Sequence, residues 1–414
     1  MEKGYVPAEN LSEPVDYAIV NTCGFILPAK EESIDRILEL VELKKEGKIG
    51  KIVVAGCLMQ RYFSELKNEI PEIDYFVGLN DIEKIVDIIE KREQAEFKLP
   101  YYIYSENSPR VLSNTVYEYV KISEGCNHTC GFCAIPGIRG KLRSRTVDSI
   151  KNEVKTLVER GYKEIILISQ DSTMYGFDLG MKDGLASLLE ELVKIEGDFW
   201  IRVMYLFPGE VSDRLLSVMA ENKHKICNYI DIPLQHASKK VLKSMRRPGD
   251  GNEYLKLIEK IRKVFDNDVF IRTALIVGFP GETEEDFEQL KQFVKDARFN
   301  HLGVFTYSRE EDTPAFPLGD DVSEDTKVKR MNEIMEMQKE LSYNINKRFV
   351  GKVMSVLIEG YYEETEYLLK GRHMGQAPDI DGVTLINDGI ADVGDFKKVE
   401  IEMAMHYDIL GKIL

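Results

Sequence analysis

The stretch VYEYVKISEGCNHTCGFC, residues 116–133, is the most informative part of this chain. Residues 116–122 are predicted to form a strand, and three cysteines follow directly in a C-x3-C-x2-C arrangement. Three thiolates on one tight loop can hold three corners of a cubane iron–sulfur cluster and leave one iron open for a substrate or cofactor. Cys126, Cys130 and Cys133 are therefore predicted to be cluster ligands.

A zinc site is a less suitable explanation for the same cysteines. Structural zinc has four protein ligands, usually supplied as two separated pairs. The nearest fourth candidate, His128, lies inside the loop and is poorly placed to complete a tetrahedron with all three thiols.

Nothing in the sequence indicates export or membrane insertion. No run of about 18 apolar residues is present, and the first residues lack the apolar core of a signal peptide. We therefore expect a cytoplasmic protein without a membrane partner. In that compartment thiols stay reduced, and clustered cysteines serve as metal ligands or catalytic groups.

Composition narrows the class of protein. The chain has 414 residues, of which 43% are hydrophobic and 30% charged. These values are typical of a globular protein with two or three domains and exclude a disordered, collagenous or disulfide-stapled chain. The net charge is −16, from 55 Lys plus Arg against 71 Asp plus Glu. Because an acidic surface repels a phosphate backbone, a general nucleic-acid binder is disfavoured.

The first hundred residues alternate strand and helix patterns. Apolar runs at 17–20 and 52–55 predict two strands, and the periodicity of 31–45 predicts a helix between them. This alternation indicates a small parallel sheet, in which functional residues gather at the carboxyl ends of the strands. Cys23 and Cys57 each follow one strand, so both are expected along one edge of the sheet.

A longer alternation occupies the middle of the chain. Strands are predicted near 116–122, 164–169, 200–207, 229–234, 269–277 and 302–307. Helices are predicted between them near 147–159, 184–195, 210–221, 251–265 and 283–297. Six strand–helix units are too few for a closed eight-strand barrel and indicate an open, partial one. A long amphipathic segment, roughly 323–349, leads out of this unit.

The last part of the chain changes character. From residue 351, short strands are separated by Gly, Asp and Asn, which predicts a small all-β barrel or sandwich. The expected fold class is therefore α/β with three parts. They are a parallel α/β domain at 1–100, the partial barrel at 116–343 and the β domain at 344–414, with a linker at 101–115.

The C-x3-C-x2-C loop resembles the signature of the radical S-adenosylmethionine (SAM) superfamily. This resemblance implies a partial (β/α)6 barrel whose 4Fe–4S cluster binds SAM through its open iron. It also implies an external electron donor, because reduction of the cluster cleaves SAM to a 5′-deoxyadenosyl radical that abstracts hydrogen from a C–H bond. The cofactor carries the difficult chemistry, and the protein positions and shields it.

Nearly the whole chain resembles one branch of that superfamily, the methylthiotransferases. CAIP at 133–136, followed by RG at 139–140 and RSR at 143–145, matches the branch's extension of the cluster loop. TCG at 22–24 and AGC at 55–57 match two of three cysteine motifs that hold a second 4Fe–4S cluster. The terminal β region resembles the TRAM domain, which grips the substrate. By this resemblance one SAM methylates a sulfur carried at the second cluster, and another supplies the radical.

Three features favour the RimO type of this branch, which methylthiolates the β-carbon of an aspartate in ribosomal protein S-twelve of the small subunit. PLQHAS at 233–238 contains the Gln-His pair typical of that type, and APDIDG at 377–382 resembles its TRAM motif. From residue 345 on, eight Lys plus Arg against twelve Asp plus Glu leave a net charge of −4. An RNA-binding module is basic, whereas an acidic module suits a basic ribosomal protein. Nucleic acid is therefore not expected as the direct substrate.

Two alternatives stay open on the sequence. The chain could be a tRNA adenosine methylthiotransferase, or a non-catalytic iron–sulfur binding protein. The second alternative is kept because this sequence departs from the family pattern. The family begins with a further strand and a Gly-Cys loop, whereas here no cysteine precedes Cys23. The chain starts where the next helix of the family ends, so we expect a truncated or mis-assigned start, a second cluster one ligand short and impaired sulfur insertion. Cys227 is a poor replacement and is predicted to be a small buried hydrophobe.

Several further residues are candidates for binding the cofactor. By the resemblance, Phe132 is expected near the SAM adenine and Gln170 and Asp171 near the SAM amino group. Loop packing and a helix N-cap are the alternatives. Gln235 and His236 end the fourth barrel strand and are expected to face the open mouth of the barrel, with a satisfied core histidine as the alternative.

Two arginines complete the set of candidates. Arg272 lies inside an apolar run, where a buried guanidinium needs an anionic partner. The SAM carboxylate is one candidate partner, and a barrel acid such as Asp231 is the other. Arg143 is expected either to contact cofactor or substrate or to be a solvated charge.

Thr283 is predicted to be the N-cap of the helix that follows it.

Overall fold

The computed structural model describes residues 4–6, 8, 13–91, 99–108, 110 and 112–414. The chain forms two compact units. The first consists of Met1–Tyr102, Gly125–Lys141 and Ser308–Pro317, and the second of Ile103–Glu124, Leu142–Tyr307 and Leu318–Leu414. The helix end expected at the start of the chain, and residues 109 and 111 of the expected linker, lie outside the described residues. The domain boundaries stay a prediction.

The first unit is built on a small parallel sheet, as expected, although its third strand was not predicted. Its strands follow the order β1 (Val15–Thr22), β2 (Ile49–Gly56), β3 (Tyr75–Val77). Three α-helices of this region are α1 (Leu27–Lys45), α2 (Cys57–Glu69) and α3 (Ile85–Lys91). Ile37 of α1 and Leu58 of α2 are buried against Ile52 and Val54 of the central strand. Burial of these side chains fixes both helices on the sheet.

Six parallel strands form the core of the second unit. One sheet has the order β4 (Tyr117–Lys121), β7 (Glu164–Ile168), β8 (Trp200–Val203), and the other has β9 (Tyr229–Asp231), β10 (Phe270–Val277), β11 (His301–Thr306). A bridge between Ile201 and Ile226 and a hydrogen bond from Leu206 N to Asp231 O continue the arrangement from β8 to β9. The expected partial barrel is confirmed. The short pair β5 (Ser123–Glu124) and β6 (Arg143–Ser144) was not expected.

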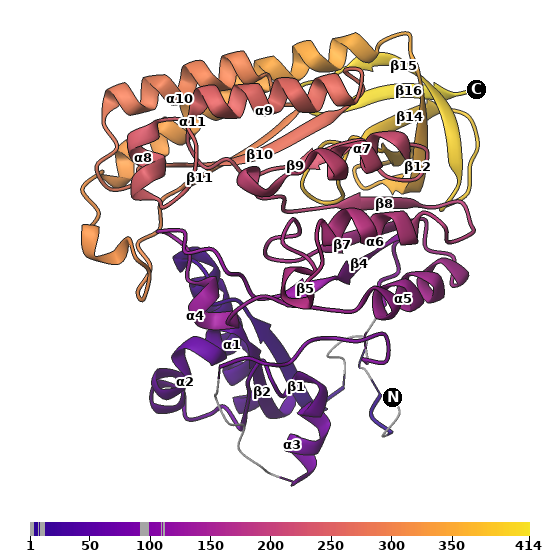
Figure 1. The fold of residues 1–414 in the computed structure, drawn as a ribbon. Coiled ribbons are helices and arrows are strands. Elements are labelled where there is room, and N and C mark those ends of the chain that lie inside the picture. The colour runs from indigo at the N-terminus through magenta and orange to yellow at the C-terminus, as the bar shows by residue number, and fades with distance from the viewer. Residues whose placement is uncertain (1–3, 7, 9–12, 92–98, 109, 111) are drawn as a thin grey trace. The chain divides into compact units, whose positions relative to one another are not determined.

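Helices cover the strands of this barrel (Figure 1). They are α5 (Val147–Glu159), α6 (Gly184–Leu192), α7 (Asp213–Glu221), α8 (Lys239–Ser244), α9 (Gly251–Val264), α10 (Glu284–Ala297) and α11 (Glu324–Asn346). A Ser, Thr or Asp side chain before most of them accepts a hydrogen bond from the first turn, as Thr146, Ser212, Asp250, Thr283 and Ser323 do. Local capping therefore sets where these helices begin. Thr283 and Asp286 form a complete capping box, which confirms the expected N-cap.

The C-terminal strands close into a small barrel, as expected. Its order is β12 (Val353–Tyr362), β13 (Thr365–His373), β14 (Thr384–Asp388), β16 (Ile409–Ile413), β15 (Phe396–Ala404). The last strand, β16, was not predicted. It contains Gly411, where a Cβ atom would lie 2.3 Å from the carbonyl oxygen of Glu400, so only glycine permits this close pairing.

A buried ionic network joins this small barrel to the amino-terminal side of the barrel strands. Glu164, the first residue of β7, accepts hydrogen bonds from Arg202 (2.6 Å) and from Arg372 of β13 (2.5 Å), and the side chains of all three are at most 1% exposed. Burial alone raises the pKa of Glu164, but the two guanidinium charges outweigh it and hold the pKa below its usual value. The carboxylate is therefore ionised and is the centre of the junction.

No helix in the described part of the chain is long and apolar enough to cross a membrane.

Candidate functional site

The loop with three cysteines is fixed by backbone hydrogen bonds. Cys126 N donates to Gly140 O (3.1 Å), and Cys133 N donates to Cys130 O (3.1 Å). Gly125, just before the loop, has φ +80°, and a Cβ atom there would lie 2.2 Å from the carbonyl oxygen of Lys141. Only glycine fits this close turn, which makes the chain double back so that the three thiols share one short loop.

A second segment of the same unit, Ser308–Pro317, contacts the cysteine loop. Ala315 N of this segment donates a hydrogen bond to Gly131 O of the loop (2.8 Å). Cys130 is buried, whereas Cys126 and Cys133 are partly exposed. The donor set is therefore three thiols on a pinned loop with two of them reachable, which fits a cubane cluster that leaves one iron for a cofactor.

Among the described residues, no three His, Cys, Asp or Glu side chains are arranged so that they could hold a single metal ion.

Cys23 and Cys57 lie at one edge of the N-terminal sheet. Thr22 and Gly56, the residues before them, are register partners at the ends of β1 and β2. Gly24 packs directly on the start of α2, because a Cβ atom there would lie 2.8 Å from Leu58 Cα. The two cysteines are thus brought together by strand register and by a glycine contact, as the alternation of strands and helices predicted.

The cysteine loop and the sheet edge are connected through Arg139. This residue ends α4 (Ile135–Arg139), the short helix after the loop, and its Nη2 donates a hydrogen bond to Cys57 Sγ at 3.0 Å. Ala134 and Ile138 pack with Cys57 in one buried cluster. Both sets of cysteines belong to the same compact unit. The RG pair of the sequence motif therefore contacts a candidate ligand of the second cluster.

Glu310 is the centre of a buried ion-pair cluster in this unit. Its carboxylate, 1% exposed, accepts hydrogen bonds from Lys30 of α1 (2.8 Å) and Arg61 of α2 (2.9 Å). Arg61 also donates to the carbonyl oxygen of Gly24 (2.9 Å). Burial raises the pKa of Glu310, but these cations outweigh it and hold the pKa below its usual value. The segment Ser308–Pro317, which contacts the cysteine loop, is therefore also connected through Arg61 to the loop that contains Cys23 and Gly24.

Gln170 and Asp171 follow the second barrel strand, as expected. Asp171 is buried, and its Oδ1 accepts a hydrogen bond from Thr173 N at 2.9 Å. This is a local Asx turn and not a helix N-cap, because the next α-helix, α6, begins only at Gly184. The helix-cap alternative is therefore wrong. A role for the two side chains toward SAM stays a prediction.

Gln235 and His236 differ in their surroundings. Gln235 is partly buried, has φ +72° and forms a bridge with Leu275 of β10. His236 is fully buried, and its Nδ1 accepts a hydrogen bond from Ser238 N at 3.0 Å. Burial lowers the pKa of His236 to about 3, so the imidazole is neutral. Because the imidazole is fully enclosed, the structure favours a core histidine over a side chain that faces the open mouth of the barrel.

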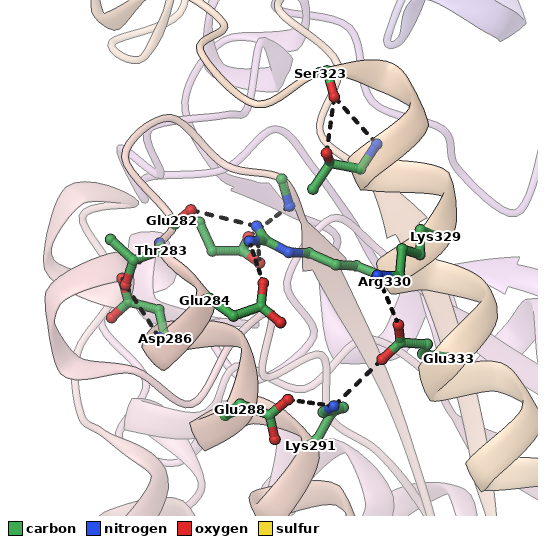
Figure 2. Close-up of polar contacts among 12 residues, drawn as sticks. Glu282, Thr283, Glu284, Asp286, Glu288, Lys291, Ser323, Lys329, Arg330 and Glu333 are labelled. Carbon is green, nitrogen blue, oxygen red and sulfur yellow. Dashed lines mark hydrogen bonds and ion pairs between the residues drawn. The ribbon is translucent and has the colours of Figure 1, made fainter.

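The carboxylate of Glu282 lies near this histidine, with Oε2 3.9 Å from His236 Nε2. It accepts hydrogen bonds from the backbone of Gly278 (2.5 Å) and Phe279 (3.2 Å). Arg330 of α11 donates hydrogen bonds to Glu282 (3.0 Å) and Glu284 (3.2 Å), and Figure 2 shows its side chain pointing toward both carboxylates. His236 Nε2 has no hydrogen-bond partner among the described residues. The group positions the turn before α10.

Arg272 has carboxylate partners within the protein. It is the third residue of β10, and its Nη1 donates to Asp381 Oδ1 at 2.6 Å. Nε lies 3.8 Å from Asp231 Oδ1. The expected alternative, an ion pair with the barrel acid Asp231, is therefore present. The ion pair with Asp381 was not predicted. Contact with the SAM carboxylate stays a prediction.

The remaining two candidates are Phe132 and Arg143. Phe132 lies within the cysteine loop and is partly buried. Arg143 lies in β6, where it is the register partner of Glu124. Their roles toward cofactor or substrate also stay predictions. Cys227 is buried, as expected of a small buried hydrophobe, and burial raises the pKa of its thiol to about 12.

Three protein-family models match consecutive parts of the chain. The model of the Radical SAM superfamily matches residues 120–294, and that of the TRAM domain matches 350–414. Residues 1–78 match the model described as Uncharacterized protein family UPF0004.

Two relatives extend over nearly the whole chain. Ribosomal protein uS12 methylthiotransferase RimO from Bdellovibrio bacteriovorus is 47% identical over 97% of this chain and 90% of the relative. The protein of that name from Myxococcus xanthus is 47% identical over 100% of this chain and 86% of the relative. This chain belongs to the RimO family of radical SAM methylthiotransferases. Membership of the family implies a 4Fe–4S cluster and SAM.

A solved structure shares the fold of this chain at low sequence identity. The radical SAM methyltransferase TsrM from Kitasatospora setae, with cobalamin and a 4Fe-4S cluster bound, has a TM-score of 0.56 and 12% identity. The match covers 83% of this chain and 70% of that chain. It supports the fold alone.

Sequence reasoning missed the contribution of Glu310 and did not assign a contact to Arg139. Arg139 lay inside a quoted motif, yet its partner is 82 residues away. Glu310 follows the carboxyl end of the last barrel strand, a position that commonly carries function in such folds, and that signal could have found it.

Proposed function

We propose that this chain methylthiolates the β-carbon of an aspartate in ribosomal protein uS12. The observation that carries the proposal is the likeness to uS12 methylthiotransferases, which runs through the cysteine loop, the cysteines at the sheet edge and the acidic terminal barrel together. A shared site motif alone would support only the superfamily.

Two sets of thiols carry the proposed cofactors. Cys126, Cys130 and Cys133 hold the 4Fe–4S cluster that binds SAM, and Cys23 and Cys57 supply thiolates to a second one. When bound, these clusters supply the electron that cleaves SAM and the site from which sulfur is transferred. The chain itself orients the thiols, through the turn at Gly125 and the hydrogen bond from Arg139 to Cys57.

The other candidate residues are proposed to act around SAM and the substrate or to orient the segments that do. This set consists of Phe132, Arg143, Gln170, Asp171, Gln235, His236 and Arg272. His236 and Arg272 are held by contacts inside the protein, so we propose that they orient neighbouring segments. An external electron donor completes the system, and the reaction belongs in the cytoplasm, where ribosomal proteins are assembled.

An anaerobic assay tests the substrate. The reconstituted enzyme is supplied with SAM, a reductant and either uS12 or bulk tRNA, and both products are analysed by mass spectrometry. A methylthio group on one aspartate of uS12 is expected. Modification of tRNA instead would overturn the choice of substrate, and modification of neither would favour the non-catalytic alternative.

Cysteine variants test the assignment of the first cluster. Replacing Cys126, Cys130 and Cys133 with Ala is expected to abolish formation of 5′-deoxyadenosine from SAM. Cys227→Ala is the matched control, because that thiol is buried and is predicted to be a packing group. Continued formation of 5′-deoxyadenosine by the triple variant would contradict the ligand assignment.

A further inference from the structure

The segment Ser308–Pro317 is connected to both loops that carry candidate cluster ligands. Toward the Cys23 loop, the connection runs through Arg61 of α2. Its Nη1 donates hydrogen bonds to Glu310 Oε2 of the segment (2.9 Å) and to the carbonyl oxygen of Gly24 (2.9 Å). The side chain of Arg61 is 5% exposed, so both hydrogen bonds are shielded from water and strengthened by the low local dielectric.

The same segment also caps the helix that follows the Cys23 loop. Ile26 occupies the N-cap position of α1 and provides no side-chain capping hydrogen bond. Leu27 N instead donates to Ser308 Oγ (3.3 Å), which satisfies one of the unpaired N–H groups at the start of the helix. Ser33 of α1 accepts a hydrogen bond from Cys23 N (3.0 Å). The backbone of this candidate ligand is therefore held on a helix that the segment caps.

Between its two ends the segment forms a compact turn with hydrogen bonds of its own. Thr313 Oγ1 donates to the carbonyl oxygen of Glu310 (2.6 Å), and Phe316 N donates to the carbonyl oxygen of Thr313 (3.1 Å). Thr313 and Ala315 are both buried. Ala315 N then donates to Gly131 O of the cysteine loop (2.8 Å). Because close-packed, internally bonded structure transmits strain, a displacement at one end of the segment reaches the other.

We infer that Ser308–Pro317 is a positioning segment that fixes the Cys23 loop relative to the cysteine loop and thereby couples SAM cleavage to methylthiolation. This inference rests on the proposed function. SAM cleavage depends on the cysteine loop alone, whereas methylthiolation depends on both cysteine sites in a fixed relation. A misplacement of about 1 Å between reacting groups can lower a rate about a hundredfold. The segment therefore acts on product formation through the two loops and not as a catalytic group.

Matched variants separate this role from general stability. The hydroxyl of Thr313 bonds within the segment, so Thr313→Val opens the turn at nearly constant volume, and Thr313→Ser retains the hydroxyl as its control. Arg61→Lys keeps a cation beside Glu310 but loses the planar fork that also reaches the carbonyl oxygen of Gly24. Glu39→Gln, in α1 at a 57% exposed position, is the surface control.

The first measurement is hydrogen exchange of the reconstituted protein, followed by mass spectrometry in peptides that cover 22–26 and 126–133. Thr313→Val and Arg61→Lys are each expected to raise the exchange rate in both loops at least about threefold. Thr313→Ser and Glu39→Gln are expected to match the wild type. Faster exchange in one loop only, or in neither, would show that the segment does not connect them and would overturn the inference.

The second measurement compares two products of an anaerobic reaction with uS12, which are 5′-deoxyadenosine and methylthiolated uS12. In Thr313→Val and Arg61→Lys, the amount of 5′-deoxyadenosine formed per methylthio group is expected to rise at least about fivefold, while the rate of its formation stays within about twofold of the wild type. Thr313→Ser is expected to restore the wild-type ratio. An unchanged ratio, or a parallel loss of both products, would assign the segment a merely structural role and overturn the inference.

Failure of the proposed function is recognised separately. Wild-type enzyme that modifies no uS12 would refute that function and the coupling with it. Hydrogen exchange needs no substrate, so it would still decide whether the segment connects the two loops. Thermal unfolding checks that the variants fold. If Thr313→Val does not fold, Arg61→Lys carries both measurements, with Glu39→Gln as its control.

Discussion

Arg139 donates a hydrogen bond to the sulfur of Cys57 at 3.0 Å, so the helix that follows the radical-SAM cysteines contacts the neighbouring cysteine site directly. Hydrogen bonds to cysteine sulfur help to set the reduction potential of an iron–sulfur cluster. We expect Arg139→Gln to lower the potential of the second cluster, because a positive donor to its ligand is lost, and Arg139→Lys to lower it less.

The measurement is a redox titration of reconstituted protein followed by electron paramagnetic resonance, together with the rate at which a chelator removes iron. Arg36→Gln is the matched control, because Arg36 lies in the same unit and its side chain is 68% exposed. Equal potentials and iron-loss rates in Arg139→Gln and the wild type would show that the contact does not affect the cluster.

The buried carboxylate of Glu310 is expected to hold the segment Ser308–Pro317 against α1 and α2. Glu310→Ala leaves Arg61, whose side chain is 5% exposed, without its carboxylate partner. Removal of one member of a buried pair costs about 3 kcal/mol or more. We expect a lower free energy of unfolding and faster limited proteolysis of 308–317. Glu39→Ala, in α1 with a side chain that is 57% exposed, should show neither effect.

The network around Glu164 is expected to dominate the stability of the second unit. Glu164→Gln removes the charge that compensates Arg202 and Arg372, and both guanidinium groups stay buried. We expect a loss of about 3–5 kcal/mol in the free energy of unfolding, measured by urea denaturation. Glu42→Gln, at a 69% exposed position, should change little. A loss in Glu164→Gln no larger than in the control would refute the role of the network.

Acid sensitivity is expected from His236. Burial lowers its pKa from 6.5 to about 3, so the unfolded chain binds a proton that the folded protein does not bind between these values. Stability should therefore fall as pH decreases below about 6.5, by up to about 1.4 kcal/mol per pH unit from this group. His236→Gln should reduce that slope in urea titrations between pH 7 and about 4.5, whereas His224→Gln, at an exposed position, should retain it. An unchanged slope in His236→Gln would show that the histidine is not the source.

The elements that local chemistry specifies were predictable from the residues alone. Apolar periodicity placed all six barrel strands, and Thr283 was identified as a cap, because capping involves residues within one turn. The spacing of Cys126, Cys130 and Cys133 restricted the possible chemistry, because three thiols on one short loop are close in any conformation. The short strand β16 was missed, since its pairing depends on Gly411 meeting another strand.

The arrangement of the site came from contacts between distant parts of the chain. Glu310 and Arg61 are 249 residues apart, and Arg272 finds Asp381 109 residues later. No local pattern specifies such partners, because they meet only when burial of apolar faces brings their elements together. The residue types and spacing in the sequence thus identified the family, and they predict the cysteine ligands. Which charges neutralise one another, and which side chains are enclosed, depended on packing, because a buried charge takes its partner from whatever the fold places beside it.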